Sequence, residues 1–406
     1  MKFSEIEACR LCKSSDLELF LDLGEQPYSG IFPNKEDKDL PIGQLKLLQC
    51  RQGCGLIQMA SNFDLDEMYG ENYGYRSGLN SSMVEHLKKR AVYAVKIADL
   101  KPNDLVVDIG ANDGTSLGFF NENYNSLGFD PSAEKFKSYI PDGVDIVFDF
   151  FSEDLFKKVS VKSKAKLITS YSMFYDLPDP LGFAKAVYNC LDEDGIWITE
   201  QSYILNMVDA NSYDTICHEH LEYYGLEQIL YLSTKVGFDI IDLDFNDING
   251  GSFVVTFKKS DASFVCSKFL KYLKLEQDRN IKTKEFATQF FNRIKKSRKE
   301  LISFLENCKN KNKTVGILGA STKGNVILNY CNISAHDIPF VGEVNMDKIG
   351  KFTPGSKIPI ITEEDILSKN LDYYLILPWH LKSFFISNKK FNNKNLVFPL
   401  PNIEII

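Results

Sequence analysis

One stretch in the first third of this 406-residue chain constrains its fold more than any other, Leu105-Val-Val-Asp-Ile-Gly-Ala-Asn-Asp-Gly114. Its apolar start has the branching of a strand buried on both faces, and Asp108 ends that strand. Gly110 and Gly114 then permit a tight turn with close backbone approach, because neither carries a Cβ. We expect Thr115–Phe120 to begin a helix. A strand, a glycine turn and a helix open a doubly wound α/β domain, and ligands bind at such a turn.

The residues of this turn favour a cationic ligand over a dinucleotide. A dinucleotide motif would place glycine two positions after Gly110, where this chain has Asn112. The carboxylates of Asp108 and Asp113 also disfavour a pyrophosphate. S-adenosylmethionine fits, because it offers an amino group, a sulfonium and a ribose diol but no phosphate. A second strand ends in Asp130, roughly 20 residues after the turn, at the spacing of a ribose-hydroxyl acceptor. A ligand-free structural turn is the alternative.

Further strands complete a sheet of the methyltransferase type. Val144–Val147 and Leu167–Ser170 read as the third and fourth strands. Phe238–Leu243 and Phe253–Phe257 are expected to form an antiparallel hairpin at the sheet's end. The residues predicted to bind S-adenosylmethionine, the methyl donor, are Asp108, Gly110, Asn112, Asp113, Asp130, Pro131, Phe150 and Ser170.

The first 64 residues predict a structural zinc site. Cys9 and Cys12 are separated by two residues, and Cys50 and Cys54 by three. Four thiolates at such spacing form a closed tetrahedral zinc site. A catalytic zinc is disfavoured because no histidine or carboxylate joins the set, and four unrelated buried thiols are the alternative.

Composition limits the partners and the compartment. A length of 406 residues predicts two or three domains, and a net charge of −8 argues against nucleic-acid binding. No apolar run reaches membrane-spanning length, and the N-terminus lacks the apolar core of a signal peptide. We therefore expect a cytoplasmic protein whose nine cysteines are thiols or metal ligands.

Two stretches of the middle segment carry candidate chemistry. Met68–Gly78 is rich in tyrosine and glycine, and it either packs in the core or lines the ligand mouth. Tyr213–Tyr224 contains the sequence His218-Glu219-His220. Histidine is the side chain best suited to proton transfer near neutral pH, and a flanking carboxylate can orient it. A solvated loop and a second zinc site are the alternatives.

The last segment contains a second glycine turn, of opposite character. Phe264–Lys309 predicts a long helix or a helix pair. Thr314–Asn325 then reads as a strand and a glycine turn opening a helix, with Lys323 and hydroxyls but no acid. Such a turn suits an anion, for instance a diphosphate, although an empty packing domain is an equal alternative. The predicted substrate-binding residues are Lys323, Asn325, Tyr224 and Asp176.

These motifs together resemble the sugar C-methyltransferase family, three-domain enzymes that act on nucleotide-linked deoxyketosugars. The resemblance covers nearly the whole chain. It rests on the paired cysteines, Asp108-Ile-Gly-Ala-Asn-Asp-Gly, Gly128-Phe-Asp-Pro, Tyr213-Asp-Thr-Ile-Cys-His-Glu-His, Gly319-Ala-Ser-Thr-Lys-Gly-Asn and Lys351-Phe-Thr-Pro-Gly-Ser-Lys-Ile-Pro-Ile. It implies an α/β fold with a zinc-binding domain over residues 1–64, a Rossmann-like methyltransferase domain over 65–259, and a helical linker plus a second Rossmann-like, substrate-binding domain over 260–406.

The resemblance also implies a mechanism. His220 would remove the proton alpha to a ketone, Glu219 would tune this base, and Tyr75 would hydrogen-bond the sugar; His218 completes the catalytic candidates. The chain departs from the family at Cys217, where tyrosine is frequent, in the turn Phe174-Tyr175-Asp176, and at Asn249, where histidine is common. These departures leave open an O-methyltransferase of the same build, or a non-catalytic zinc and nucleotide-sugar binding protein. A monomer or a homodimer is expected.

Overall fold

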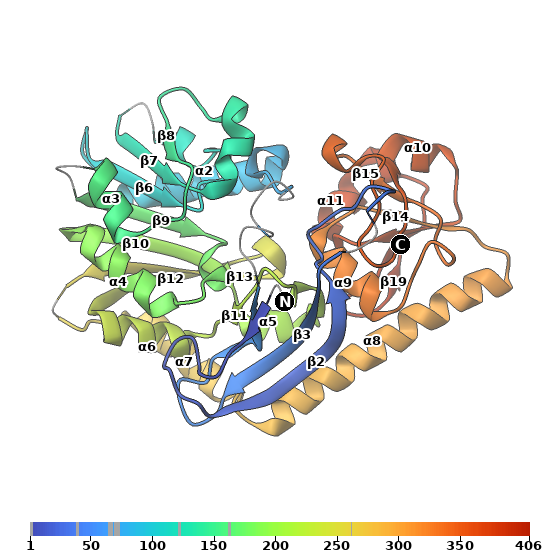
Figure 1. Ribbon diagram of the computed structural model, residues 1–406, viewed down its shortest axis with the longest axis horizontal. Coiled ribbons are helices and arrows are strands. Elements are labelled where there is room, and N and C mark those ends of the chain that lie inside the picture. Colours follow the sequence, from blue (N-terminus) through green and yellow to red (C-terminus); the bar gives the residue numbers. More distant parts are fainter. Residues whose placement is uncertain are drawn as a thin grey trace.

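Three sheets dominate the computed structural model, which describes residues 3–37, 40–63, 68, 74–120, 123–160, 164–260 and 262–406 (Figure 1). The N-terminal sheet is antiparallel, with strand order β11-β4-β3-β2. Its strands are β2 (Leu17–Pro27), β3 (Ile42–Cys50), β4 (Ile57–Met59) and β11 (Glu222–Tyr223), and a small ribbon pairs β1 (Phe3–Glu5) with β5 (Ser61–Phe63). Because β11 comes from far along the chain, this sheet is joined to the middle segment by backbone hydrogen bonds.

The central sheet has the order β12-β13-β10-β9-β6-β7-β8. Its strands are β6 (Leu105–Ile109), β7 (Asn125–Phe129), β8 (Asp145–Val147), β9 (Ala165–Tyr171), β10 (Leu191–Ser202), β12 (Phe238–Asn246) and β13 (Ser252–Lys259). The strands from β10 to β8 run parallel, while β12 and β13 form the expected antiparallel end. The helices of this segment are α2 (Ser81–Ile97), α3 (Glu153–Val159), α4 (Pro180–Cys190), α5 (Ile204–Asp209) and α6 (Leu226–Val236).

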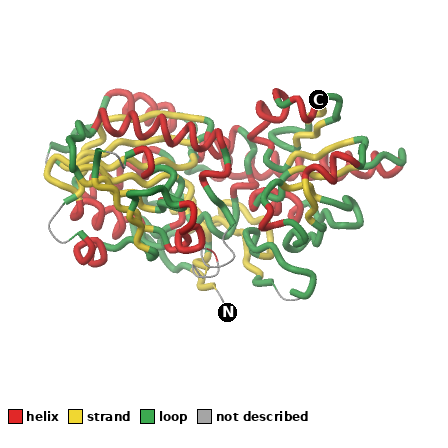
Figure 2. Tube along the Cα trace, turned by 90° about the horizontal axis from the view of Figure 1, so that it is seen from above, coloured by secondary structure: helices red, strands yellow, loops and turns green. Residues whose placement is uncertain are grey.

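The C-terminal sheet is parallel except at its last strand, with the order β16-β15-β14-β17-β18-β19. Its strands are β14 (Val315–Leu318), β15 (Val341–Glu343), β16 (Ile360–Thr362), β17 (Tyr373–Ile376), β18 (Leu396–Phe398) and β19 (Glu404–Ile405). Helices α9 (Thr322–Tyr330), α10 (Glu363–Ser368) and α11 (Lys382–Ser387) accompany it. The central and C-terminal sheets lie in separate lobes, seen from above in Figure 2.

The expected helix pair consists of α7 (Ser267–Gln277) and α8 (Lys284–Asn310). Thr283 caps α8 by accepting a hydrogen bond from Phe286 N, and apolar side chains at helical spacing bury one face. Near the start of α8, the ring centroid of Phe290 lies 6.4 Å from that of Phe20 in β2. Near its end, the ring centroid of Phe304 lies 5.3 Å from that of Tyr373 in β17. The helix therefore bridges the N-terminal sheet and the C-terminal lobe (Figure 1).

One expected element is wrong. The residues after the first glycine turn form only a 3₁₀ turn over Leu117–Phe119 and no α-helix. Gly118, Asn121 and Asn123 give the sequence that links this turn to β7 a low helix propensity, which explains the difference. The expected domain boundary at residues 64 and 65, and residues 69–73 of the tyrosine-rich stretch, lie outside the described residues. The boundary at residues 259 and 260 falls at the end of β13 and stays a prediction.

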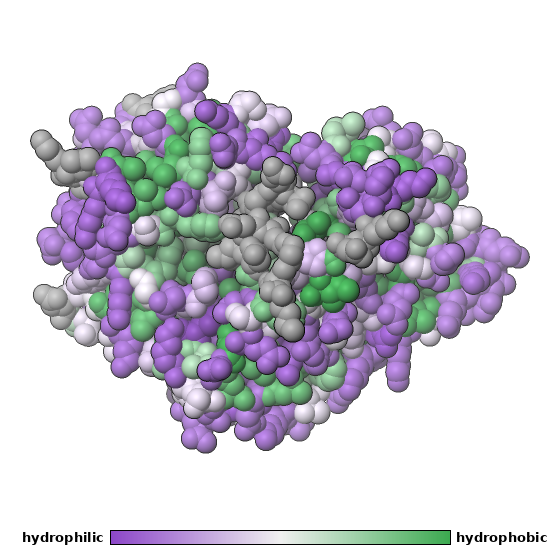
Figure 3. Space-filling view, viewed as in Figure 1, coloured by the Kyte–Doolittle hydropathy of each residue, from purple (hydrophilic) through white to green (hydrophobic). Residues whose placement is uncertain are grey.

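Hydrophilic side chains cover most of the face seen in Figure 3, including the outer end of α8. Among the described residues, no helix combines the length and the apolar character needed to cross a bilayer.

Candidate active site

The four N-terminal cysteines converge on one point. Cys9 Sγ lies 3.6 Å from Cys54 Sγ, and Cys12 Sγ lies 3.5 Å from Cys50 Sγ. All four sulfurs lie within 4.8 Å of one another. The edge of a zinc–sulfur tetrahedron is about 3.8 Å, given zinc–sulfur bonds of about 2.3 Å. A Cβ at Gly53 would crowd two of these sulfurs, so the turn between the cysteines requires glycine. The donor set fits structural zinc.

A cavity of about 320 Å³ opens at the carboxyl ends of β6, β7 and β9. The strand order reverses between β6 and β9, and open α/β sheets bind ligands at such switch points. Gly110 has φ +79°, and a Cβ there would come within 2.9 Å of the Met173 side chain. Glycine is therefore required where the turn meets the next strand.

Asp130 stabilises the turn from the adjacent strand end. Its Oδ2 accepts a 2.8 Å hydrogen bond from Asn112 N, and its Oδ1 accepts from the backbone and hydroxyl of Ser132. Pro131 and Phe150 also line the cavity. Since Oδ2 keeps a lone pair, Asp130 can still accept a hydroxyl from a ligand.

Asp108 gives the cavity a titratable acid. It is 3% exposed, and Thr169 donates a 2.6 Å hydrogen bond to its Oδ1. Burial raises the pKa of Asp108 to about 7, the Thr169 hydroxyl opposes this shift, and the nearby charge of Asp130 adds to it. Asp176 and Glu200 also line the cavity, and among the described residues that line it there is no lysine or arginine. The lining fits a cationic ligand such as S-adenosylmethionine.

Asn112 and Asp113 hold a cover segment (residues 75–78) over the turn. Asn112 Oδ1 accepts from Ser77 N at 2.9 Å, and its Nδ2 donates to the carbonyl of Tyr75. Asp113 Oδ2 accepts a 2.9 Å hydrogen bond from Gly78 N. Asp113 itself, which was predicted to bind the ligand, does not line the cavity. Tyr75 lines the cavity, and burial raises the pKa of its phenol to about 12.

The loop of residues 217–220 lies beside this cavity. His220 Nδ1 lies 2.8 Å from the carbonyl oxygen of Thr215, which can only accept, so Nδ1 carries the proton and Nε2 is free of it. The ring packs edge-on against Tyr175 at 4.5 Å, and Leu221 N donates to the Tyr175 carbonyl. Burial lowers the pKa of His220 to about 3, with a further contribution from Lys323, so its neutral form prevails at neutral pH.

Glu219 lies close to residues of the N-terminal segment and of the C-terminal lobe. A Cβ on Gly30 would collide with Glu219 Oε1 and would lie 3.9 Å from Thr322 Oγ1 at the start of α9. Burial raises the pKa of Glu219 to about 7, while Lys348 and Lys323 oppose the shift. Burial likewise lowers the pKa of both lysines, opposed by nearby acids that include Glu219. Glu219, Lys323 and Lys348 are therefore close enough in this desolvated region for their charges to act on one another.

Asn249 connects the cavity to the second glycine turn. Its Nδ2 donates to Ser172 Oγ at 3.2 Å, and Ser172 lines the cavity. Its carbonyl accepts from Lys323 Nζ, also at 3.2 Å. Asn249 thus links Ser172 of the cavity wall to Lys323 of the C-terminal lobe.

Three family models match consecutive parts of the chain. A zinc binding domain matches residues 9–69, a methyltransferase domain matches 83–243, and a C-methyltransferase C-terminal domain matches 247–401. The C-methyltransferase NovU of Streptomyces niveus is 27% identical over 409 residues, covering 99% of this chain and 97% of NovU. Over nearly its whole length the chain is therefore similar to C-methyltransferases. It is an S-adenosylmethionine-dependent methyltransferase with a structural zinc site.

Solved structures resemble a smaller part of this methyltransferase. An S-adenosylmethionine-dependent methyltransferase from Clostridium acetobutylicum is 13% identical and covers 43% of this chain and 91% of its own, with a TM-score of 0.34. The YcgJ protein of Bacillus subtilis is 13% identical and covers 43% of this chain and 98% of its own, with a TM-score of 0.33.

Several candidate residues of the methyltransferase lie away from the cavity wall. His218 Nε2 lies 3.2 Å from the carbonyl of Gly43, and its ring packs between Tyr28 and Phe63. Ser170 is fully buried and accepts from Trp197 Nε1. The cavity-lining residues also exclude Tyr224, which packs on Phe174, and Asn325, which donates to Ser29 O. Their assigned roles stay predictions.

Sequence reasoning missed other residues of the site. Glu200 lines the cavity near the end of β10. Lys348 lies near Glu219, and His380 lies near Lys323. Glu200 carried a usable signal, because it directly follows the strand-like run Ile196–Thr199, as Asp108 follows Leu105–Val107. Lys348 and His380 had none, since only the tertiary fold brings them to the site.

Proposed function

We propose that this enzyme transfers a methyl group to the carbon alpha to the ketone of a nucleotide-linked sugar, with His220 as the base. The observation that carries the proposal is the fixed tautomer of His220. Its protonated Nδ1 is held by the Thr215 carbonyl, so the basic Nε2 is the nitrogen available to a substrate. The ring also lies against Tyr175, beside the cavity that suits the donor.

The chain's own groups account for each proton and charge. Nε2 of His220 takes the alpha proton and becomes an imidazolium, which the nearby carboxylate of Glu219 stabilises. The electrons of the broken carbon–hydrogen bond form an enolate, whose alpha carbon is the nucleophile. S-adenosylmethionine would supply the methyl group: as the alpha carbon bonded to it, the sulfur–methyl bond would break and S-adenosylhomocysteine would leave. His220 then returns the proton to solvent.

We propose that the C-terminal lobe binds the nucleotide part of the sugar acceptor. Lys323 lies in the first turn of α9, where backbone N–H groups also favour anions. Lys348 adds a second cation, and Glu219 acts on the pKa of both lysines. We infer that this pair recognises a diphosphate between the sugar and its nucleoside.

Solvent exchange tests the choice of a carbon acceptor. The enzyme is incubated in deuterium oxide with a candidate nucleotide-linked ketosugar and S-adenosylhomocysteine, and the sugar is followed by proton NMR. We expect enzyme-dependent loss of the alpha proton signal, because His220 acts before methyl transfer. Methyl transfer without such exchange would contradict enolate formation.

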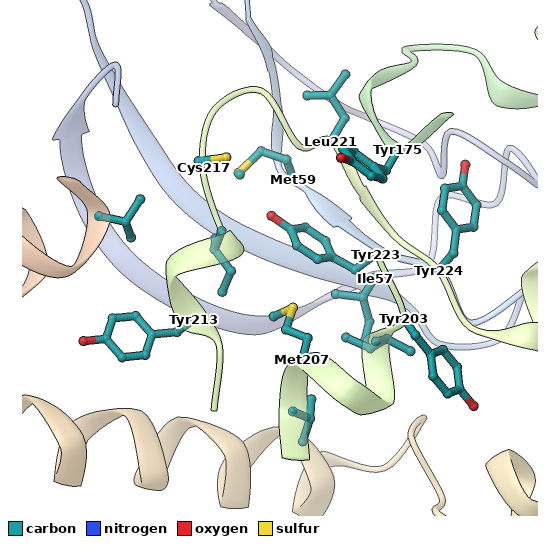
Figure 4. Close-up of a cluster of buried hydrophobic side chains, with 14 of the residues drawn as sticks. Ile57, Met59, Tyr175, Tyr203, Met207, Tyr213, Cys217, Leu221, Tyr223 and Tyr224 are labelled. Atoms are coloured by element: carbon teal, nitrogen blue, oxygen red, sulfur yellow. The ribbon is translucent and has the colours of Figure 1, made fainter. Parts of the chain in front are cut away.

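A second candidate is O-methylation by the same base. Cys217 packs among apolar residues near Met59 and Tyr223, and burial raises the pKa of its thiol (Figure 4). A neutral, buried thiol is a weak hydrogen-bond donor to an enolate, which favours a hydroxyl acceptor over a ketone. O-methylation predicts a product methyl bonded to oxygen, which carbon NMR distinguishes. A protein that fails to bind S-adenosylhomocysteine would instead be a non-catalytic binder.

The compartment and the assembly complete the proposal. None of the nine cysteines forms a disulfide, which agrees with a reducing cytoplasm. We propose a monomer or a homodimer.

A further inference from the structure

Glu200 is a buried acid of the cavity wall that the proposed chemistry does not use. It lies at the end of β10 and is 1% exposed. His86 Nε2 of α2 lies 2.9 Å from its Oε2 and 3.0 Å from its Oε1. Asn246 Nδ2 donates to Oε2 at 2.8 Å. These contacts fix the carboxylate and leave Oε1 with capacity for a donor from the cavity.

The neighbouring Tyr171 points to a missing ligand. Tyr171 lines the same cavity at the end of β9, and its buried hydroxyl has no hydrogen-bond partner among the described residues. The charges of Asp108 and Glu200 both act on this phenol. Buried hydroxyls are rarely left unpaired, so a ligand group is expected between these side chains.

The position along the sheet identifies which part of the donor would bind. Asp130 follows β7 and Glu200 lies on β10, and the strand order β10-β9-β6-β7 separates these strands by three spacings. At about 4.8 Å per spacing this is roughly 14 Å, which two inward-reaching side chains shorten. With the ribose at Asp130, the methionine end of the donor extends toward Glu200.

We infer that Glu200 and Tyr171 form the subsite for the ammonium group of S-adenosylmethionine. Glu200 Oε1 and the Tyr171 oxygen accept its N–H groups. His86 and Asn246 are positioning residues that hold the carboxylate in place. The rival explanation is that the Glu200–His86 pair only fastens α2 to the sheet.

Paired ligands separate these explanations. Binding of S-adenosylhomocysteine and of its analogue with hydrogen in place of the amino group is measured by calorimetry on the full-length zinc-loaded protein. Glu200→Gln should weaken S-adenosylhomocysteine roughly tenfold or more, because hydrogen bonds to charged groups are the strong ones. The same variant should change the affinity for the deamino analogue less than about twofold. Equal losses for both ligands, or no loss, would overturn the inference.

Further variants guard against simple misfolding. Asp244 is the matched control, because it also pairs with α2 through Arg90 but does not line the cavity. Asp244→Asn should leave both affinities unchanged, and if it copied Glu200→Gln the rival explanation would hold. Tyr171→Phe and His86→Gln should each weaken S-adenosylhomocysteine selectively, by less than Glu200→Gln does. The acceptor is absent from all these measurements, so the result is independent of which atom is methylated.

Discussion

Two histidines in one loop have opposite surroundings. His220 has a ring nitrogen free for chemistry, whereas His218 is 1% exposed between aromatic rings. His220→Asn should therefore lower kcat by about 10²-fold or more, the usual contribution of a general base. Donor affinity should not change, because His220 does not line the donor cavity. Steady-state kinetics and calorimetry with S-adenosylhomocysteine measure the two effects.

His218→Asn is the matched control for this experiment. It should lower the melting temperature, because an amide replaces a ring packed on Tyr28 and Phe63. The folded variant should keep most of its turnover. A loss of turnover equal to that of His220→Asn would assign the chemistry to the wrong histidine.

Asp108 predicts a pH dependence of donor binding. Burial raises its pKa to about 7, so the carboxyl gains a proton as the pH falls through 7 and loses its attraction for a cation. The dissociation constant of S-adenosylhomocysteine should be roughly tenfold higher at pH 6 than at pH 8, as expected for one ionising group. Calorimetry at both values tests this. Asp108→Asn should bind weakly with no such slope, and a slope that survives in the variant would exclude Asp108 as its source.

At the scale of single elements, the sequence predicted the strands of the central sheet well. Runs such as Leu105–Val107 are apolar because both faces of a parallel strand are buried. The sequence also identified Asp108 and Asp130, because acids that end such strands meet at one edge of the sheet. It could not reveal that Glu222–Tyr223 would join the N-terminal sheet, since two-residue strands carry no periodicity.

The zinc site supports an element that reaches the active-site loop. Strand β4 follows Cys54, and Met59 N at its end donates to Leu221 O directly after His220. Cys54→Ser should lower the melting temperature by about 10 °C or more, because structural zinc contributes folding free energy. Turnover should fall with zinc content, as measured by metal analysis and thermal unfolding.

Cys190→Ser provides the control for this change. Cys190 is a buried thiol of α4 that lies far from the zinc cluster in sequence and is not part of it. Its substitution should cost a few degrees and leave the zinc content unchanged. If both serine variants lost the same stability, the four cysteines would not be holding a metal.

At the scale of the whole molecule, the site depends on how the three sheets are assembled. Glu219 comes from the middle segment, Gly30 from the N-terminal segment, and Lys323 from the C-terminal lobe. Helix α8 bridges the outer two, and β11 ties the first to the middle. Such contacts between distant segments are set by tertiary packing, so no local pattern could have predicted them.

This arrangement predicts that substituting Gly30 by alanine, which adds one methyl group to the N-terminal segment, will impair catalysis. Gly30→Ala would place its Cβ on Glu219 Oε1, and the flexible carboxylate must move away from its place near the lysines. We expect kcat to fall roughly tenfold with little change in stability, because only the end of one side chain has to shift. Gly24→Ala is the control: it meets no atom within 4 Å but is strained at φ +83°, so it should lower stability and leave kcat unchanged. A Gly30→Ala enzyme with full turnover would show that the position of Glu219 does not matter to the base.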